Sequence, residues 1–185
     1  MMGQGVALVV VDVQVGFEDP RFGRRDNPAC EANVLTLLDR WRAGRRPVVL
    51  VQHDSAEPSS PLRPGTPGHA LKPGIAGPAD LHLHKTVHSA FHGAPALHPW
   101  LQARGIERLV ICGITTDHCC STTARVACDL GYTVDFVLDA THTFDRRGAD
   151  GTVIPAETVA RVEAAVLGGE FATLRATAEV LAELG

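Results

Sequence analysis

The chain has 185 residues and a formal net charge of −4 at pH 7. This length fits a single domain over residues 1–185 with a full core. The acidic balance gives no footprint for nucleic acid, and the apolar stretches are too short to span a membrane. Five cysteines without framework spacing, and an N-terminus without a signal-peptide pattern, predict a protein of the reducing cytoplasm.

Short apolar runs alternate with amphipathic segments along the chain. The runs that predict strands lie at residues 6–13, 47–51, 81–84, 109–112, 133–138 and 171–174. The segments that predict helices lie at residues 28–43, 95–104, 115–130, 155–167 and 177–184. Strands that alternate with helices predict a three-layer α/β fold, with a doubly wound, mostly parallel sheet and helices on both faces.

Two stretches between these elements predict long loops. Residues 55–78 are rich in Pro, Gly and Ser and are too long for an ordinary connection, so they predict a lid or an interface loop. Residues 139–151 predict another loop at the same end of the sheet.

Residues 108–132, RLVICGITTDHCCSTTARVACDLGY, place a cysteine at the junction of a strand and a helix. The strand is followed by a glycine and by three candidate N-cap residues, Thr115, Thr116 and Asp117. Cys119 would then lie in the first turn of the helix, where free backbone N–H groups and the helix dipole favour a thiolate. Ligands of open α/β sheets bind at this end of the strands, so the junction is the predicted active site.

Two further polar residues follow predicted strands and can join this cysteine. Asp12 lies at the end of the first apolar run, and Lys85 follows the run at 81–84. The carboxyl ends of parallel strands share one edge of the sheet, so Asp12, Lys85 and Cys119 can converge there. The cysteine would be the nucleophile, the aspartate would take its proton, and the lysine would hold the pair or stabilise developing charge. Taken singly, the same residues also fit ordinary roles as a loop cap, a surface lysine and a buried cysteine.

At these positions the chain resembles the isochorismatase-like cysteine hydrolases, a family that includes nicotinamidases and carbamoylsarcosine amidohydrolases. The matching segments are VVVDVQVGF at 9–17, KTVHSAFHG at 85–93 and CGITTDHCCSTTARVACDLGY at 112–132, in the family's order and spacing. The resemblance implies a sheet of about six parallel strands and a catalytic triad of Asp12, Lys85 and Cys119. It also implies a homo-oligomer, a dimer or a tetramer, often with the long loop near a neighbouring subunit.

The resemblance further implies a cis peptide bond between Ile114 and Thr115. This bond would aim the backbone N–H of Thr115 into an oxyanion hole, together with that of Cys119. Two positions depart from the family pattern, since Cys120 stands where valine is common and Ala94 where threonine is frequent. Neither position belongs to the triad.

A metal-assisted nicotinamidase is the alternative within the enzyme class. Nicotinamidases carry an Asp-x-His pair and further histidines that bind a metal beside the pocket, whereas the corresponding stretch at 51–54 reads VQHD. His82 and His84 share one strand face, and His88 and His92 have the i, i+4 spacing of a chelating pair. No carboxylate or cysteine joins either pair at a recognisable ligand spacing. The sequence therefore predicts no catalytic metal and no other cofactor.

Four residues are candidates for contacts with the substrate: Phe17, His53, His88 and His118. Phe17 belongs to the first motif of the resemblance. His53 and His118 lie at predicted strand or helix ends beside the pocket. Each of these two histidines either contacts the substrate or makes a structural hydrogen bond.

The expected function is that of a cofactor-independent cysteine hydrolase acting on a small amide, imide or carbamoyl compound through a thioester. Family members that cleave the vinyl ether of isochorismate lack the cysteine, so Cys119 favours cleavage of a C–N bond. Two rivals remain open: a dithiol redox protein that uses Cys119 and Cys120, and a catalytically silent ligand-binding module. Neighbouring helical side chains point about 100° apart, which favours core packing for Cys120. The remaining cysteines lie within apolar patterns and predict core packing: Cys30, Cys112 and Cys128.

Overall fold

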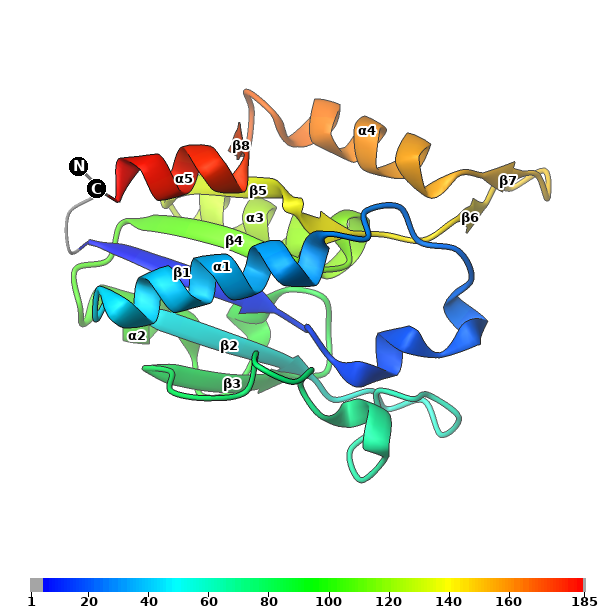
Figure 1. Ribbon diagram of the computed structural model, residues 1–185, viewed down its shortest axis with the longest axis horizontal. Helices are drawn as coiled ribbons and strands as arrows, with labels where there is room; N and C mark the ends of the chain where they lie inside the picture. Colours follow the sequence, from blue (N-terminus) through cyan, green and yellow to red (C-terminus); the bar gives the residue numbers. More distant parts are fainter. Residues whose placement is uncertain (1–4, 185) are drawn as a thin grey trace.

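The computed structural model describes residues 5–184, and its centre is one six-stranded sheet (Figure 1). Neighbouring strands run parallel throughout, in the order β3-β2-β1-β4-β5-β8. The strands are β1 (Val6–Val11), β2 (Val48–His53), β3 (Leu81–Lys85), β4 (Arg108–Ile114), β5 (Thr133–His142) and β8 (Thr173–Arg175). The predicted doubly wound α/β fold is confirmed.

Helices cover both faces of the sheet (Figure 1). They are α1 (Cys30–Ala43), α2 (Leu97–Gln102), α3 (Ser121–Asp129), α4 (Ala156–Leu167) and α5 (Thr177–Glu183). Leu8 and Val10 of β1 pack in the cluster that contains residues of α1 and α5, whereas Ala7 and Val9 pack in the cluster with α2, α3 and α4. This alternation follows from the two-residue period of a strand, and it makes the central strands apolar on both faces. None of the helices described within residues 5–184 is long and apolar enough to cross a membrane.

The segment after β5 differs from the predicted loop at 139–151. β5 continues through residues 139–142, because Thr141 and His142 are buried and pair with β4 beyond a register shift. The next residues form an antiparallel hairpin of β6 (Arg146–Arg147) and β7 (Val153–Ile154). Polar residues in this part of β5 interrupt the apolar pattern, so the sequence did not reveal the end of the strand.

The helix after β4 also begins differently from the prediction. Thr116–Cys120 form one π-helical turn, η5, and α3 begins only at Ser121. Thr115 occupies the N-cap position without a side-chain hydrogen bond to the turn. The Asp117 carboxylate does not cap the helix but pairs with Arg146, whose Nε lies 2.7 Å away. The predicted capping role is therefore corrected to an ion pair that ties η5 to the hairpin.

The long loop at 55–78 contains one short 3₁₀ helix, η3 (Pro67–His69). Its far end runs beside the segment that follows β1, where the Val15 N–H donates to the Ala70 carbonyl and the Lys72 N–H donates to the Val13 carbonyl, both at 2.9 Å. The loop is thereby fixed next to the carboxyl end of β1.

Gly113 allows β1 and β4 to approach closely near their carboxyl ends. Its φ is 125°, and a Cβ built on it would lie 2.0 Å from the Val11 carbonyl oxygen. Val11 is the register partner of Gly113 across the two strands. Only glycine fits this approach. Gly113, which breaks the apolar run, therefore allows the strands that precede Asp12 and Cys119 to lie close together.

Candidate active site

Asp12 follows β1 directly and is completely buried. Its backbone N–H donates to the Val51 carbonyl of β2 at 2.9 Å, which fixes the chain as it leaves the sheet. Its φ of 50° lies in the left-handed region, which residues other than glycine seldom adopt and which is concentrated at functional sites. The sheet therefore holds this carboxylate in a defined position at its carboxyl edge.

Lys85 is the last residue of β3 and is also buried, with 2% of its surface exposed. Its Nζ lies 2.5 Å from Asp12 Oδ2 and 3.3 Å from Cys119 Sγ. A buried ammonium needs a compensating charge, and the Asp12 carboxylate supplies it. The structure thus brings Asp12, Lys85 and Cys119 together from three distant parts of the chain, with Lys85 in contact with both partners.

Cys119 lies in the η5 turn with 8% of its surface exposed. The turn follows the peptide bond between Ile114 and Thr115, which is cis and is the bond for which the resemblance implied this geometry. The Thr115 carbonyl accepts the N–H of Cys120 at 3.1 Å, so the backbone before the cysteine is anchored in the turn. This anchoring places the sulfur at a fixed point beside Lys85.

The three charges of the site influence one another strongly. Burial raises the pKa of Asp12, although the Lys85 ammonium opposes the increase. Burial raises the pKa of the Cys119 thiol as well, and the Asp12 carboxylate adds to this effect against Lys85. For Lys85 the two acidic partners outweigh burial, so its pKa is raised and its ammonium stays protonated.

The sequence favoured a thiolate at Cys119, but the raised pKa favours the thiol in the free protein. Burial and the Asp12 charge outweigh the stabilisation that Lys85 gives to a thiolate. The thiol form of Cys119 is favoured, so the cysteine needs a base before it can attack.

His53, at the end of β2, is the predicted substrate-binding residue that touches the triad. Its Nδ1 lies 3.4 Å from Lys85 Nζ, and burial together with the Lys85 charge lowers the pKa of His53 to about 4. The buried Gln14 side chain accepts the His53 N–H at 2.9 Å and donates to the His53 carbonyl at 3.1 Å. Gln14 was not among the predicted site residues, and its only signal was its place two residues after Asp12 in VVVDVQVGF.

His88 and His118 form an exposed pair next to Cys119. Their ring centroids lie 5.7 Å apart with the planes at 80°. His88 is close enough to Asp12 to lower the pKa of that carboxyl. Burial lowers the pKa of His118, against the neighbouring Asp117 carboxylate. Both rings can therefore meet a ligand that approaches Cys119 from solvent.

Phe17 packs in a different hydrophobic cluster from Cys119. Its ring packs against Phe22 and Phe144, with centroid distances of 5.1 and 6.2 Å. These rings are on the α1 side of the sheet, whereas Cys119 packs with the cluster on the other face. A contact between Phe17 and the substrate stays a prediction.

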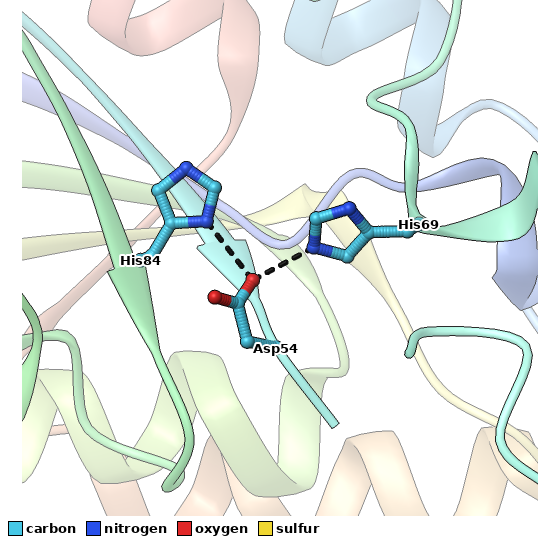
Figure 2. Close-up of side chains that lie close together, drawn as sticks. All are labelled: Asp54, His69 and His84. Carbon is cyan, nitrogen blue, oxygen red and sulfur yellow. Dashed lines mark hydrogen bonds and ion pairs between the residues drawn. The ribbon is translucent and has the colours of Figure 1, made fainter. Parts of the chain in front are cut away.

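A second group of polar side chains gathers beside β2 and β3, namely Asp54, His69 and His84 (Figure 2). One possible ligand atom from each residue lies within 4.8 Å of the other two. From the sequence His84 was paired with His82 instead, because Asp54 and His69 come from other positions in the chain.

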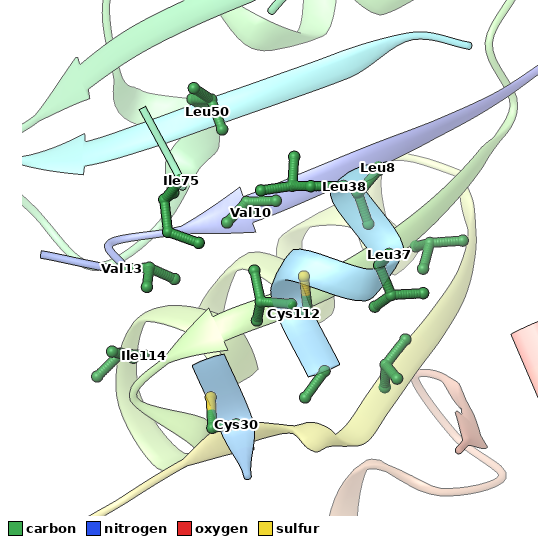
Figure 3. Packing of buried hydrophobic residues seen from close by; sticks show 14 of the residues in the cluster. Leu8, Val10, Val13, Cys30, Leu37, Leu38, Leu50, Ile75, Cys112 and Ile114 are labelled. Carbon is green, nitrogen blue, oxygen red and sulfur yellow. The ribbon is translucent and has the colours of Figure 1, made fainter. Parts of the chain in front are cut away.

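The remaining cysteines are not part of the triad. Cys30 and Cys112 are buried between α1 and the sheet, and burial raises the pKa of both thiols (Figure 3). Cys120 is fully buried on the other face, with its pKa raised by burial. Cys128 is half-buried, with its Sγ 3.8 Å from the Glu170 carbonyl oxygen. The complete burial of Cys120 fits core packing rather than exchange with thiols in solution.

The fold and the position of the site define an α/β protein with its polar centre above the carboxyl ends of parallel strands. The family model described as the Isochorismatase domain matches residues 6–159. The chain belongs to the isochorismatase family of hydrolases.

Individual relatives match over most of the chain. The isochorismatase family protein YrdC of Bacillus subtilis is 37% identical over 182 residues, which cover 97% of this chain and 96% of that protein. A streptothricin hydrolase of Streptomyces noursei is 34% identical over 89% of this chain and 66% of its own length. A solved structure from Chromobacterium violaceum, described as an isochorismatase-family hydrolase, superposes with a TM-score of 0.94 at 35% identity. That superposition covers 100% of this chain and 96% of the other.

Proposed function

We propose that this protein is a cysteine hydrolase that cleaves the C–N bond of a small amide, imide or carbamoyl compound through a thioester. The observation that carries the proposal is the position of Lys85 Nζ, 2.5 Å from Asp12 Oδ2 and 3.3 Å from Cys119 Sγ. A nucleophile, a base and a fixed cation that lie together can support acyl transfer to a cysteine.

In the first step Asp12 accepts the thiol proton, and the Cys119 sulfur attacks the carbonyl carbon of the substrate. Asp12 Oδ1 is buried and accepts no hydrogen bond from the described residues, so it has a lone pair for this proton. Burial raises the pKa of Asp12, which makes the carboxylate a stronger base. Lys85 keeps its proton and stabilises the negative charge, whether that charge is on the carboxylate or on the sulfur.

The carbonyl oxygen becomes an oxyanion as the sulfur attacks. The backbone N–H groups of Thr115 and Cys119 are the proposed donors to this oxygen. When the tetrahedral intermediate collapses, the C–N bond breaks and the leaving nitrogen takes the proton from Asp12. The acyl group remains on Cys119 as a thioester.

The second half of the reaction restores the enzyme. A water molecule gives a proton to Asp12 and attacks the thioester carbonyl. The C–S bond breaks, and the sulfur recovers the proton from Asp12 as the acid leaves. The sum of the steps is hydrolysis, with no change of oxidation state.

The substrate contacts proposed for this reaction come from Phe17, His53, His88 and His118. His53 is neutral at physiological pH and lies against Lys85, so it can contribute a hydrogen bond without competing for the charge. The exposed pair of His88 and His118 is proposed to contact the leaving group.

A substrate panel tests the proposal. It contains primary amides, lactams and carbamoyl compounds, with streptothricin included because a relative is named for its hydrolysis, and with nicotinamide to test the alternative of a nicotinamidase. We expect release of ammonia or an amine by the wild-type protein and none by Cys119→Ala. Hydrolysis that persists in Cys119→Ala would overturn the proposal.

We also propose that the protein forms a homo-oligomer in solution. Four apolar side chains on the hairpin and on α4 are exposed: Val153, Ile154, Val162 and Val166. Light scattering is expected to give two or four times the chain mass of 19.7 kDa, and a mass of one chain would contradict this.

A further inference from the structure

Three separate segments contribute the cluster of Asp54, His69 and His84. Asp54 follows β2, His84 lies in β3 at the edge of the sheet, and His69 ends η3 in the long loop. Figure 2 shows both imidazole rings directed at the same carboxylate oxygen. This oxygen, Asp54 Oδ1, lies 2.7 Å from His69 Nε2 and 2.9 Å from His84 Nδ1.

We propose that these three residues bind a divalent cation of the zinc type. Two imidazole nitrogens and one carboxylate oxygen form a protein ligand set that zinc uses when a water completes its coordination. With bonds of about 2.0–2.1 Å, the ligand atoms of a tetrahedral zinc ion lie about 3.3 Å apart. The three atoms already lie within 4.8 Å of one another, so small side-chain movements place them around an ion.

The surroundings of the cluster suit a metal ion. The side chains of Asp54 and His84 are 27% and 43% exposed, so a water can take the remaining position. Gln52 holds two of the neighbouring segments, since its Nε2 donates to the His69 carbonyl at 2.7 Å and its Oε1 lies 3.0 Å from His82 Nε2. These hydrogen bonds fix the His69 backbone and the neighbouring His82 ring beside the cluster.

The cluster is separate from the triad although the residues are adjacent in sequence. Successive residues of a strand point to opposite faces. His53 and Lys85 point toward each other at the triad, so Asp54 and His84 point away from it. The ion would therefore not act on a water at Cys119, and its binding does not depend on the proposed hydrolase activity.

The position of His69 indicates what the ion does. The His69 carbonyl accepts a hydrogen bond from Gln14 Nε2 at 2.8 Å, and a Cβ on Gly68 would lie 2.8 Å from the Cα of Gly16. The loop thus packs against the segment that follows Asp12. An ion held by His69 on one side and by β2 and β3 on the other would clamp this loop to the sheet.

Equilibrium dialysis of the full chain against zinc chloride, followed by metal analysis, tests the site. We expect one zinc per chain in the wild type, and a loss of affinity of about a hundredfold or more in Asp54→Asn and in His84→Ala. Asp54→Asn keeps an oxygen that can accept the two histidine hydrogen bonds but removes the charge that a metal needs. His82→Gln and Cys119→Ser are the controls, since they change a neighbouring histidine and the triad thiol without removing a ligand.

Amide hydrogen exchange supplies the second readout. Zinc should slow exchange within residues 55–78 in the wild type and in both controls, and should leave it unchanged in Asp54→Asn and His84→Ala. The proposal is overturned if the wild type binds no zinc, if both ligand variants bind it as the wild type does, or if Cys119→Ser abolishes binding. Should Asp54→Asn lose its native circular dichroism, the partly exposed His84→Ala decides the result.

Discussion

The triad and the Asp54 cluster each combine one carboxylate with two other polar side chains, but they differ in their access to water. The side chains of Asp12 and Lys85 are completely buried, whereas those of Asp54 and His84 are 27% and 43% exposed. In the buried triad no solvent screens the charges, so each charge shifts the pKa of its neighbours. At the partly exposed Asp54 cluster, water can complete the coordination of an ion.

The comparison shows that an aspartate acquires different chemistry from its burial and from its partners. The buried carboxylate of Asp12 has a raised pKa and a lone pair without a partner, which are properties of a base. The partly exposed Asp54 carboxylate accepts hydrogen bonds from two histidines, which is an arrangement that can bind a metal ion.

Removal of the sulfur should have the largest effect. Cys119→Ala is expected to lower kcat on any substrate from the panel by about 10⁴-fold or more, because alanine has no sulfur to carry the acyl intermediate. Steady-state amine release measures the loss. His92→Ala, which changes an exposed histidine outside both regions, serves as the control.

Asp12→Asn sharpens the role of the buried carboxylate. It should lower kcat by about 10²–10⁴-fold, because the thiol loses its base. It should also move the pH dependence of Cys119 alkylation to lower pH, since the Asp12 charge raises the pKa of the thiol. Iodoacetamide rates across pH follow this shift, and a move to higher pH would contradict the assigned electrostatics.

Lys85→Met tests whether the Asp12 charge depends on a buried partner. We expect the free energy of unfolding to fall by about 3–5 kcal/mol, because the variant leaves the Asp12 charge buried without its partner. The double variant Lys85→Met/Asp12→Asn should recover part of this loss, since it removes the unpaired charge. Urea denaturation measures both, and an additive loss in the double variant would show that the two side chains do not interact.

Asp117→Asn probes a charge of intermediate burial that holds η5 to the hairpin. Burial raises the pKa of Asp117, but hydrogen bonds from Arg146 and Thr143 outweigh it and lower this pKa from 3.8 to about 2. The stabilisation is therefore fully present above about pH 4 and is lost as the pH falls toward 2. The variant should lose about 1–2 kcal/mol at pH 7, and the difference from wild type should shrink below pH 4 in acid denaturation.

The smallest effect is expected for Cys120→Ala. This buried cysteine packs in the core, so its replacement should leave hydrolysis within about twofold and lower the free energy of unfolding by about 1 kcal/mol. A dithiol redox protein would lose its activity in this variant. Loss of turnover with a native circular dichroism spectrum would favour that rival.

The order of strands and helices could be predicted because apolar runs and amphipathic segments alternate clearly along the chain. The carboxyl ends of β1, β3 and β4 could then be assigned to one edge, which brought Asp12, Lys85 and Cys119 to the same place before the structure was known. The protonation state of Cys119 could not be predicted, because it depends on burial and on the distance to Asp12 rather than on the start of a helix.

Other features depend on contacts between distant segments. The end of β5 was missed because Thr141 and His142 are polar, and only their pairing with β4 makes them part of a buried strand. The contact between His69 and Asp54 could not be predicted either, because it depends on the path of the loop at 55–78. Gln14 could have been noticed as a buried polar residue near Asp12, but its two hydrogen bonds to His53 follow from the packing of β1 against β2.

The central claim is that the Cys119 sulfur carries the acyl group of the substrate. Wild-type protein quenched in acid during turnover of the best substrate from the panel, then digested and measured by mass spectrometry, tests it directly. We expect an added acyl mass on the peptide that contains Cys119, which appears during turnover and disappears when the substrate is exhausted. Turnover without any adduct on that peptide, together with full activity of Cys119→Ala, would contradict the account.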